Sequence, residues 1–340
     1  MQRRGFILLL GATLVSVAAA VVALRVGERT VSLAAPGERA LPNLAPNLGA
    51  LAWVRLNRGA MKANFAEIGG HWVVVEKGNY PADEARMRRL LLGLADLTLI
   101  EPRTQLPELF PRLDLDDPSN GKATQVVIQD RTGQTVGQLI IGKARPDRLG
   151  MGNDGLYVRR VGEERAWLAR GAIDVSGAMV SWLNPHIVDL SAGRIATMIL
   201  VGDEQGVLVI GRHAATDKFA IDNAPGGAKF KGDAAIAAPA AALEGLDLVD
   251  VKPAADQPVP DSGVSTATFS TLDGLTIRLK LFESDKQDWV VIEASGTGDA
   301  AAEGKTINDR VGRWAYAIPA AKAKLLRTNM ADLVVPAGGS

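Results

Sequence analysis

One segment has the glycine spacing of a dinucleotide-binding loop. Residues 150–155 (GMGNDG) satisfy the pattern G-x-G-x-x-G, which in such a loop follows a strand and opens a helix whose N-terminus holds the pyrophosphate. Here the residues that follow, 156–160 (LYVRR), are typical of a strand. Asn153-Asp154-Gly155 fits a hairpin turn, in which Gly and Asn adopt positive φ angles. The pattern therefore predicts a turn rather than a cofactor site.

A second candidate is an acidic cluster formed by Asp114, Asp116 and Asp117. An EF-hand loop that began at Asp114 would require Gly at its sixth position and Glu at its twelfth, but Ser119 and Gln125 stand there. A solvated turn is the expected structure. An irregular cation site is the alternative.

The three histidines, His71, His186 and His213, have no second ligand at the short spacing that zinc sites use. The chain has no cysteine and no G-x-S-x-G nucleophile motif. We therefore predict no catalytic, cofactor-binding or metal-binding residue and no cofactor. A hydrolase without a recognisable motif is kept as the third functional hypothesis.

Arginines and tryptophans are candidates for binding surfaces. Arg86, Arg88 and Arg89, with Arg103 further along, form either the solvated face of a helix or a basic patch for lipid headgroups or a partner. The tryptophans are expected to anchor cores, with stacking of an exposed pair on sugar rings as the alternative. They are Trp53, Trp72, Trp167, Trp182, Trp289 and Trp314.

The N-terminus has the pattern of a membrane-spanning segment. Arg3 and Arg4 precede an uncharged run, Gly5 to Leu24, which as a helix covers about 30 Å, the thickness of a bilayer core. The arginines favour a cytoplasmic N-terminus, so the body from Arg25 onward is expected in the periplasm. A cleaved signal peptide is the alternative, and the arginine pair also fits a twin-arginine export signal. Both routes export the body.

The composition indicates that the exported body is stabilised by packing of its hydrophobic core. Lys plus Arg equals Asp plus Glu at 38 each, which gives no long-range reason to expect nucleic acid as a partner. Without cysteine, disulfides cannot stabilise the chain. Residues 29–49 are rich in Ala and Pro, and we expect either an extended spacer or a loop whose Leu41, Leu44 and Leu48 dock on the first domain.

The first half of the body alternates short strands with amphipathic helices. A helix is expected from Pro81, because apolar residues from Met87 to Leu97 recur at the spacing of one helical face. A second helical stretch is expected to end near Trp182. Strands are expected at 52–56, 71–76, 124–129, 135–141, 156–160 and 165–169.

The second half repeats this order. A helix is expected at 234–248, with Pro239 as a break or restart, and a closing helix after Pro319. Trp167 and Trp314 are expected in equivalent places. We therefore predict two similar α+β modules in tandem, with chance similarity of two ordinary patterns as the alternative. Strands are expected at 195–201, 207–210, 218–222, 265–270, 275–282, 288–294 and 313–318.

Three segments resemble the bacterial domain-of-unknown-function family 4340. They are 71–97 (HWVVVEKGNYPADEARMRRLLLGLADL), Leu115-Asp116-Asp117-Pro118 and 314–334 (WAYAIPAAKAKLLRTNMADLV). The resemblance covers most of the chain from Leu51 to Val334. It implies an envelope protein with an N-terminal membrane anchor, often encoded beside an ABC-type exporter of the gliding-motility kind. It implies no catalytic residues.

These observations predict an α+β protein with an N-terminal transmembrane helix and two tandem modules of mainly antiparallel sheet. The expected limits are an anchor or signal at 1–28, a linker at 29–49 and modules at 50–190 and 191–335. The expected function is that of a non-catalytic, single-pass inner-membrane protein, anchored through residues 5–24 with its body in the periplasm. We expect it to be accessory to an ABC-type transport complex. A periplasmic glycan- or ligand-binding module is the second hypothesis.

Overall fold

The structure is a computed structural model that describes residues 34–119, 122–146, 155–203 and 206–335. Contacts between Cα atoms divide the chain into two compact units. The first comprises the chain up to Lys62 together with Arg88–Ser176, and the second comprises Ala63–Met87 and Gly177–Ser340. A segment from the first half of the sequence therefore belongs to the second unit.

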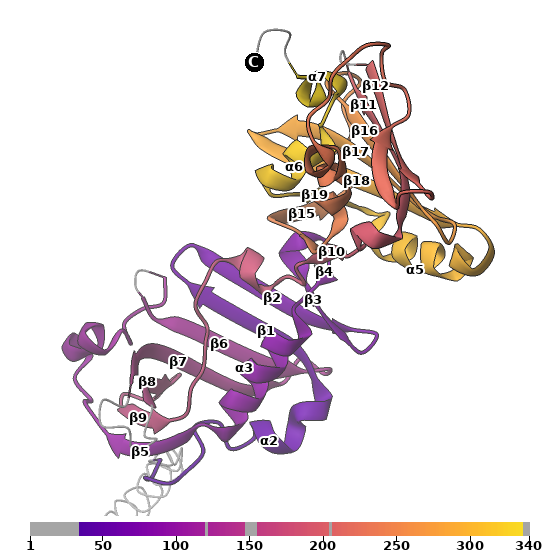
Figure 1. Cartoon of the computed structure of the whole chain (residues 1–340). Helices are drawn as coiled ribbons and strands as arrows, with labels where there is room; N and C mark the ends of the chain where they lie inside the picture. The colour runs from indigo at the N-terminus through magenta and orange to yellow at the C-terminus, as the bar shows by residue number, and fades with distance from the viewer. Residues whose placement is uncertain (1–33, 120–121, 147–154, 204–205, 336–340) are drawn as a thin grey trace, which may run out of the picture. The chain divides into compact units, whose positions relative to one another are not determined.

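The first sheet is antiparallel and has the strand order β4-β3-β2-β1-β6-β7-β8-β9-β5 (Figure 1). Strand β2 follows β1 through a tight turn at Gly59, and neither β2 nor β5 was expected from the sequence pattern. The strands are β1 (Leu51–Arg58), β2 (Met61–Ile68), β3 (His71–Val74), β4 (Tyr80–Pro81), β5 (Thr98–Pro102), β6 (Thr124–Asp130), β7 (Thr135–Arg145), β8 (Gly155–Arg160) and β9 (Ala166–Arg170).

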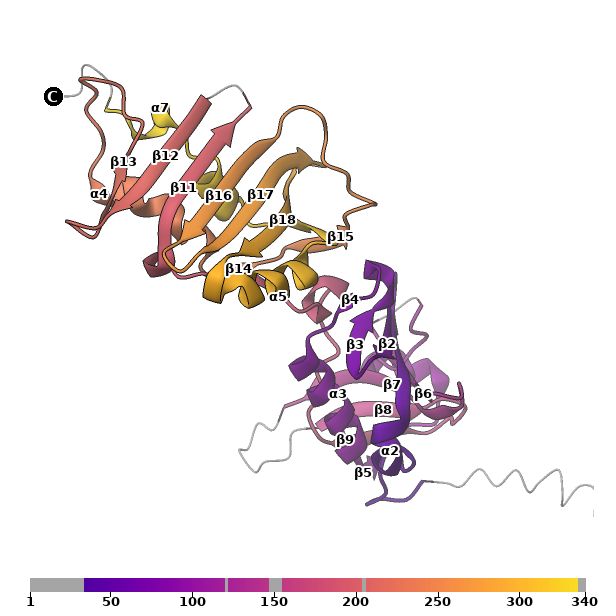
Figure 2. The same cartoon turned by 90° about the vertical axis from the view of Figure 1, so that its right-hand side faces the viewer.

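One face of this sheet forms the core of the first unit. Along β1 and β6, Val54, Leu56, Val126 and Ile128 are fully buried and alternate with more exposed residues, as expected for a sheet with one covered face. The helix α3 (Glu84–Asp96) lies against the sheet in both views (Figures 1 and 2). It begins after Asp83, and its apolar face is buried as the sequence predicted.

The second sheet is also antiparallel, with the order β13-β12-β11-β16-β17-β18-β19-β15 (Figure 2). A two-stranded sheet pairs β10 (His186–Val188) with β14 (Leu246–Asp247). The eight strands are β11 (Ile195–Gly202), β12 (Gly206–His213), β13 (Lys218–Ile221), β15 (Asp250–Pro253), β16 (Ser265–Thr271), β17 (Leu275–Ser284), β18 (Gln287–Gly296) and β19 (Trp314–Ala317).

The two sheets share one strand order. Beyond β4, each strand of the first sheet has a counterpart in the second that carries a number ten higher. Trp167 pairs with Pro102 between β9 and β5, and Trp314 pairs with Pro253 between β19 and β15. Strand β1 has a bulge where it pairs with β6, and its counterpart β11 has a bulge where it pairs with β16. The two tryptophans therefore occupy corresponding positions.

Three helical expectations need correction. The stretch before Trp182 forms only the 3-10 turn η4 (Met179–Trp182), because Gly171 and Gly177 adopt positive φ angles that interrupt a helix. The helix expected at 234–248 is divided near Pro239, as predicted, into α4 (Asp233–Ala237) and the 3-10 helix η6 (Ala238–Leu243), but it ends at Leu243, and Leu246–Asp247 form the strand β14 instead. The closing helix is divided into α6 (Ala320–Leu326) and α7 (Met330–Leu333).

The split between α6 and α7 has a local cause. Asn329 forms a capping box with Asp332, which starts a new helix at Met330. One helix was not expected at all: α5 (Ala301–Val311) packs on β18, where Gly304 lies against the backbone of Ser295. A side chain at Gly304 would prevent this close approach.

The described part of the expected linker is docked on the first unit. Leu41 and Leu44 are buried, and a four-residue helix, α2 (Leu44–Asn47), follows. The backbone N–H groups of Gly37 and Ala40 each donate a 2.7 Å hydrogen bond to carbonyls of Leu99 and Leu97. From residue 34 onward this segment is therefore a docked loop rather than an extended spacer.

Arg160 fastens the docked segment. Its guanidinium lies 2.7 Å from a carboxylate oxygen of Glu38 and donates hydrogen bonds to the carbonyls of Arg39 at 2.8 Å and Ala40 at 2.9 Å. We call Arg160 and residues 38–40 the latch. The predicted anchor, residues 5–24, lies outside the described residues. Within those residues no helix has the length and apolar composition that crossing a bilayer requires.

We expect Arg160→Met to release the latch while its side chain still fills the same space. Hydrogen bonds to a charged group contribute about 1.5–3 kcal/mol, so proteolytic cleavage within residues 34–41 should become at least about tenfold faster. Arg160 holds the pKa of Glu38 below its usual range. The latch should therefore be complete above the ordinary glutamate pKa and weaken as the pH falls through the lower value of the folded protein.

Limited proteolysis with mapping of the cut sites measures both effects. Arg89→Met, which changes an exposed arginine of α3, is the matched control and should leave cleavage unchanged. Equal cleavage of Arg160→Met and the parent chain would contradict the latch.

Candidate functional site

The acidic candidate lies at a turn, and most of the glycine-rich candidate lies outside the described residues. Residues 150–154 are outside the described residues, and Gly155 begins β8. Asp114 ends a 3-10 helix with a positive φ, and Asp117 accepts 2.8 Å hydrogen bonds from the backbone N–H and hydroxyl of Ser119. These bonds hold the pKa of Asp117 below its usual range. Among the described residues, no group of three or more His, Asp or Glu side chains is placed to hold a metal ion.

Each histidine is exposed and pairs with a single carboxylate. His71 lies 3.5 Å from Glu84, and His213 lies 2.8 Å from Asp222. His186 lies 2.7 Å from Asp247, across the β10–β14 pair. The histidines belong to different strands, so the structure does not gather them into one site. The prediction that the protein has no catalytic residue stays a prediction.

The arginines that the sequence singled out are not one patch. Arg86 lies over the ring of Trp182, 4.2 Å from its centroid, and donates a 2.9 Å hydrogen bond to the carbonyl of Ser181. Arg88 and Arg89 are exposed on α3. Arg103 follows β5 and therefore belongs to a different surface from the α3 arginines.

Four of the six tryptophans are buried anchors, Trp72 is half-buried on β3, and Trp53 is exposed. Trp167, Trp182, Trp289 and Trp314 are all buried, as expected of core anchors. Trp53 is 40 % exposed on β1, opposite Gln129 of β6. Its face of the sheet is the one that α3 does not cover.

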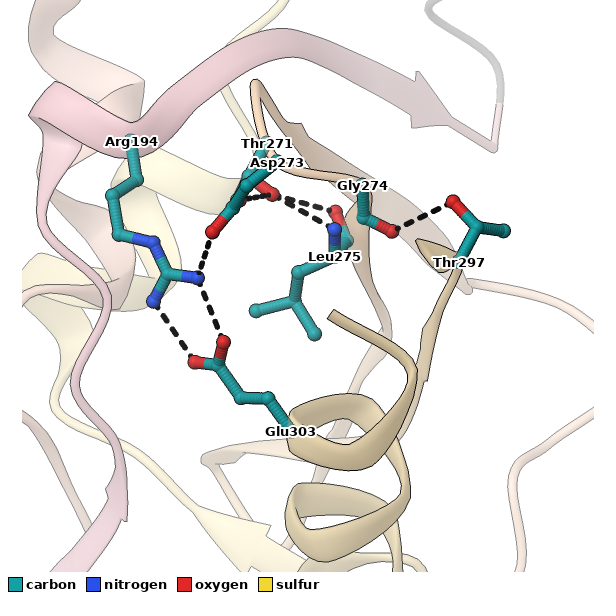
Figure 3. Close-up of polar contacts among 7 residues, drawn as sticks. All are labelled: Arg194, Thr271, Asp273, Gly274, Leu275, Thr297 and Glu303. Carbon is teal, nitrogen blue, oxygen red and sulfur yellow. Dashed lines mark hydrogen bonds and ion pairs between the residues drawn. The ribbon is translucent and has the colours of Figure 1, made fainter. Parts of the chain in front are cut away.

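An ionic cluster in the second unit centres on Arg194 (Figure 3). Both terminal nitrogens of Arg194 lie 2.8 Å from the carboxylate of Glu303, and one of them lies 2.6 Å from Asp273. Thr271 donates to Asp273 and accepts the backbone N–H of Leu275 at 2.9 Å. Arg194 closes the 3-10 turn η5 (Ala192–Arg194), Asp273 lies in the β16–β17 turn and Glu303 belongs to α5. The cluster thus joins three elements of the second unit.

The electrostatics of this cluster indicate a structural role rather than a role in proton transfer. The Thr271 hydroxyl, followed by Arg194, holds the pKa of Asp273 below its usual range. Arg194 does the same for Glu303, and these carboxylates in turn raise the pKa of Arg194. Because both carboxylates are held ionised, neither is suited to donate a proton near neutral pH. The arrangement is that of a structural ion-pair network.

A different surface offers room for a ligand. In the first unit a hollow of about 460 Å³ lies where β5 leads into the 3-10 helix η3 (Pro107–Leu113), a volume within the range of small-molecule sites. The C-terminal end of η3 lies close to Gly142 of β7, where any side chain would clash with the carbonyl of Leu113. We call this hollow the arginine hollow; it is lined by Pro102, Arg103, Thr104, Leu109, Arg112 and Leu113.

Several arginines that line the arginine hollow or lie near it have no carboxylate partner in the described part of the chain. Arg103 lies 2.8 Å from Glu101, but Arg112, Arg159 and Arg165 have no carboxylate partner within 4.0 Å among the described residues. Burial lowers the pKa of Arg159, which stays far above neutrality. Cationic walls and an apolar lining suit a ligand that is anionic at one end and apolar at the other.

Two of these arginines are fixed by neutral groups. Arg159 lies over the ring of Phe110, 4.7 Å from its centroid, and donates to the carbonyl of Glu163 at 3.2 Å. Gln105, with its amide oxygen toward Arg165, accepts from that guanidinium at 2.6 and 3.0 Å. Of these arginines, only Arg103 was singled out from the sequence. Arg112, Arg159 and Arg165 are separated by up to 53 residues, so only the antiparallel pairing of β8, β9 and β5 brings them near one another.

Comparison with known proteins identifies the family. A family model described as a domain of unknown function (DUF4340) matches residues 72–264, more than half of the chain. The chain belongs to this family. The family expected from the sequence is therefore confirmed over residues 72–264, from β3 to the residue before β16, whereas the segment 314–334 lies outside the match. No curated protein and no solved structure matches the chain.

We expect Glu303→Gln to lower the free energy of unfolding at pH 7 by about 1 kcal/mol, the upper range for a partly exposed pair. Because the pKa of Glu303 is lowered in the folded state, its contribution is present above the ordinary glutamate pKa and is lost as the pH falls through the folded value. The variant and the parent should therefore converge in acid. Urea unfolding at pH 7 and below pH 4 measures the difference.

Asp309→Asn is the matched control, because Asp309 pairs with Lys305 on the same helix but is more exposed. It should change the free energy of unfolding by only a few tenths of a kcal/mol. A difference for Glu303→Gln that persists unchanged in acid would contradict the assigned role.

Proposed function

We propose that this family member is a single-pass inner-membrane protein whose body stands in the periplasm and acts by contact, as an accessory subunit of an ABC-type transport complex. The anchor is the apolar run Gly5 to Leu24. The proposal is supported above all by the docked segment that begins at residue 34, because this segment sets how far the body can stand from the anchor.

The tether between anchor and body is short. If the anchor ends at Leu24, only residues 25–33 separate it from the docked segment. A fully extended chain spans about 3.3–3.6 Å per residue, so these nine residues reach at most about 30 Å. A spacer that extended through residue 49 would reach nearly three times as far. The latch therefore supports a body held near the bilayer, where it can contact a membrane-embedded partner.

The second unit offers an apolar surface for such a contact. Ile199 of β11 and Val207 of β12 are 38 % and 48 % exposed. Ile199 is paired with Val209, and Val207 is paired with Val201, so four aliphatic side chains share one face of the sheet. We call these four residues the aliphatic patch. Exposed apolar patches on a sheet are typical of protein contact surfaces.

We expect the full chain, extracted in mild detergent, to co-purify with the subunits of an ABC-type transporter. Replacing residues 5–24 with an unrelated transmembrane helix should remove those subunits, because helix packing within the membrane is sequence-specific. Ile199→Lys with Val207→Lys should weaken retention at least tenfold, because it places two charges in the apolar contact. Mass spectrometry of the purified material measures retention.

Leu272→Lys is the matched control, because Leu272 is an apolar residue that is 69 % exposed in the β16–β17 turn. It should leave retention unchanged. A reporter fused after Ser340 should be active only in the periplasm. Activity in the cytoplasm, or full retention with the unrelated helix, would refute the proposal.

A glycan-binding function is the second candidate, because one exposed ring lies on an open polar sheet face. Trp53 of β1 stands beside Arg55 on that face, and Arg55 donates a 2.8 Å hydrogen bond to the side chain of Gln129. An aromatic ring next to amide and guanidinium groups can stack on a sugar and bind its hydroxyls.

We expect Trp53→Ala to reduce retention of the full chain on purified cell-wall material several-fold if this second function holds. Leu92→Ala, which removes an apolar side chain that is 48 % exposed on α3, is the control. Sedimentation with the insoluble cell wall measures retention. Equal sedimentation of the parent, Trp53→Ala and control chains would exclude Trp53 as a glycan platform.

A further inference from the structure

We propose that the arginine hollow binds the phosphate headgroup of an anionic phospholipid in the membrane that holds residues 5–24. This inference rests on the proposed anchoring and adds a second, lipid-specific attachment to it. Three observations support it: Arg112 has no carboxylate partner among the described residues, part of the lining of the hollow is apolar, and the hollow lies near the start of the described chain.

The first step is the chemistry of the hollow. Arg112 lies on its rim, is exposed and has no hydrogen-bond or ion-pair partner among the described residues. Arg103 forms an ion pair with Glu101, and η3 itself carries one acidic residue, Glu108. Guanidinium groups bind phosphate oxygens through paired N–H donors. The hollow therefore presents donors for a phosphate above the apolar side chains of Leu109 and Leu113.

The second step is the apolar side. Leu106 immediately precedes η3, and its side chain is 53 % exposed. Its backbone N–H donates a 3.0 Å hydrogen bond to the hydroxyl of Thr104, which fixes it beside the hollow. A free inorganic anion gains nothing from Leu106 or Leu109. A phospholipid, which joins a phosphate to glycerol and acyl chains, contacts both kinds of surface.

The third step is proximity to the tether. Arg159 contacts Phe110 of η3 and the carbonyl of Glu163, while a carboxylate oxygen of Glu163 lies 3.4 Å from Arg160. Arg160 in turn holds Glu38 of the latch. The second carboxylate oxygen of Glu38 accepts the backbone N–H of Ala35 at 3.1 Å. A continuous set of contacts thus connects the wall of the hollow to the point where the described chain begins.

The turn between β8 and β9 is the middle of this path, since Glu163 lies within it. The hollow and the start of the docked segment therefore flank the same end of β8. With residues 25–33 spanning at most about 30 Å, an embedded anchor leaves the hollow within reach of the headgroups. An anionic leaflet attracts arginines that come within about a Debye length of its surface.

The experiment uses the full chain in lipid nanodiscs. Because the chain has no cysteine, Leu106→Cys introduces a single labelling site beside the hollow for an environment-sensitive fluorophore. The quencher is a lipid with a spin-labelled headgroup. We expect strong quenching in discs that contain phosphatidylglycerol and weak quenching in discs of phosphatidylcholine alone. A fluorophore at Leu92→Cys, an exposed position on α3 of the same unit, should show no such lipid dependence.

Arg103→Gln with Arg112→Gln should lower the ratio of docked to undocked protein about 30-fold, which corresponds to about 1 kcal/mol for each arginine at an anionic surface. Arg112→Gln alone tests the same site without disturbing the pair of Arg103 with Glu101. The matched control is Arg88→Gln with Arg89→Gln, which removes two exposed arginines of α3 and should preserve quenching.

Four results would overturn the inference. Quenching that is equal in both kinds of disc would show that the headgroup charge is irrelevant. Equal loss in the α3 control would show that overall charge, not the hollow, attracts the lipid. Relief of quenching by millimolar inorganic phosphate would identify a site for free anions instead. A chain that does not co-elute with the discs would refute the anchoring itself, and with it both proposals.

Discussion

The latch between Arg160 and residues 38–40 is the interaction on which the functional interpretation depends. One guanidinium satisfies a carboxylate and two backbone carbonyls. Those carbonyls would otherwise lie without partners beside the edge of β5, where the free energy of an unpaired polar group is unfavourable. Arg160 thus holds a segment that is rich in Ala and Pro at a defined position on the first unit, where it connects the body to the proposed anchor.

The shared strand order explains why each sheet has a covered and an open part on its outer face. In the first unit the segment between β5 and β6 places Phe110 and Leu115 over Ile140. In the second unit the segment between β15 and β16 places Val259 and Val264 over Trp289. Trp53 lies exposed on β1, and the aliphatic patch lies exposed on β11, the counterpart of β1, and on its neighbour β12.

Arg194 and Arg112 differ in how many carboxylates they contact, and this difference separates a structural ion pair from a candidate ligand-binding site. Arg194 meets two carboxylates, whose pKa values it lowers, and the result is a fastening between a turn and a helix. Arg112 meets no carboxylate among the described residues, and it borders an apolar hollow. A paired guanidinium has little left to offer a ligand, whereas one that lacks a counter-charge gains from an incoming anion.

The sequence by itself determined the α+β class, most strands of both sheets, α3 and the family, because alternation and helical spacing are local properties. It did not reveal β2, whose small and polar residues lack a strong strand pattern, or α5, whose apolar face is weak. Only the tertiary structure decided that Leu41 and Leu44 dock on the first unit and that Arg159 lies over Phe110 of η3, next to the hollow that Arg112 lines. Those contacts join residues far apart in the chain, and their formation depends on strand register, which no local pattern encodes.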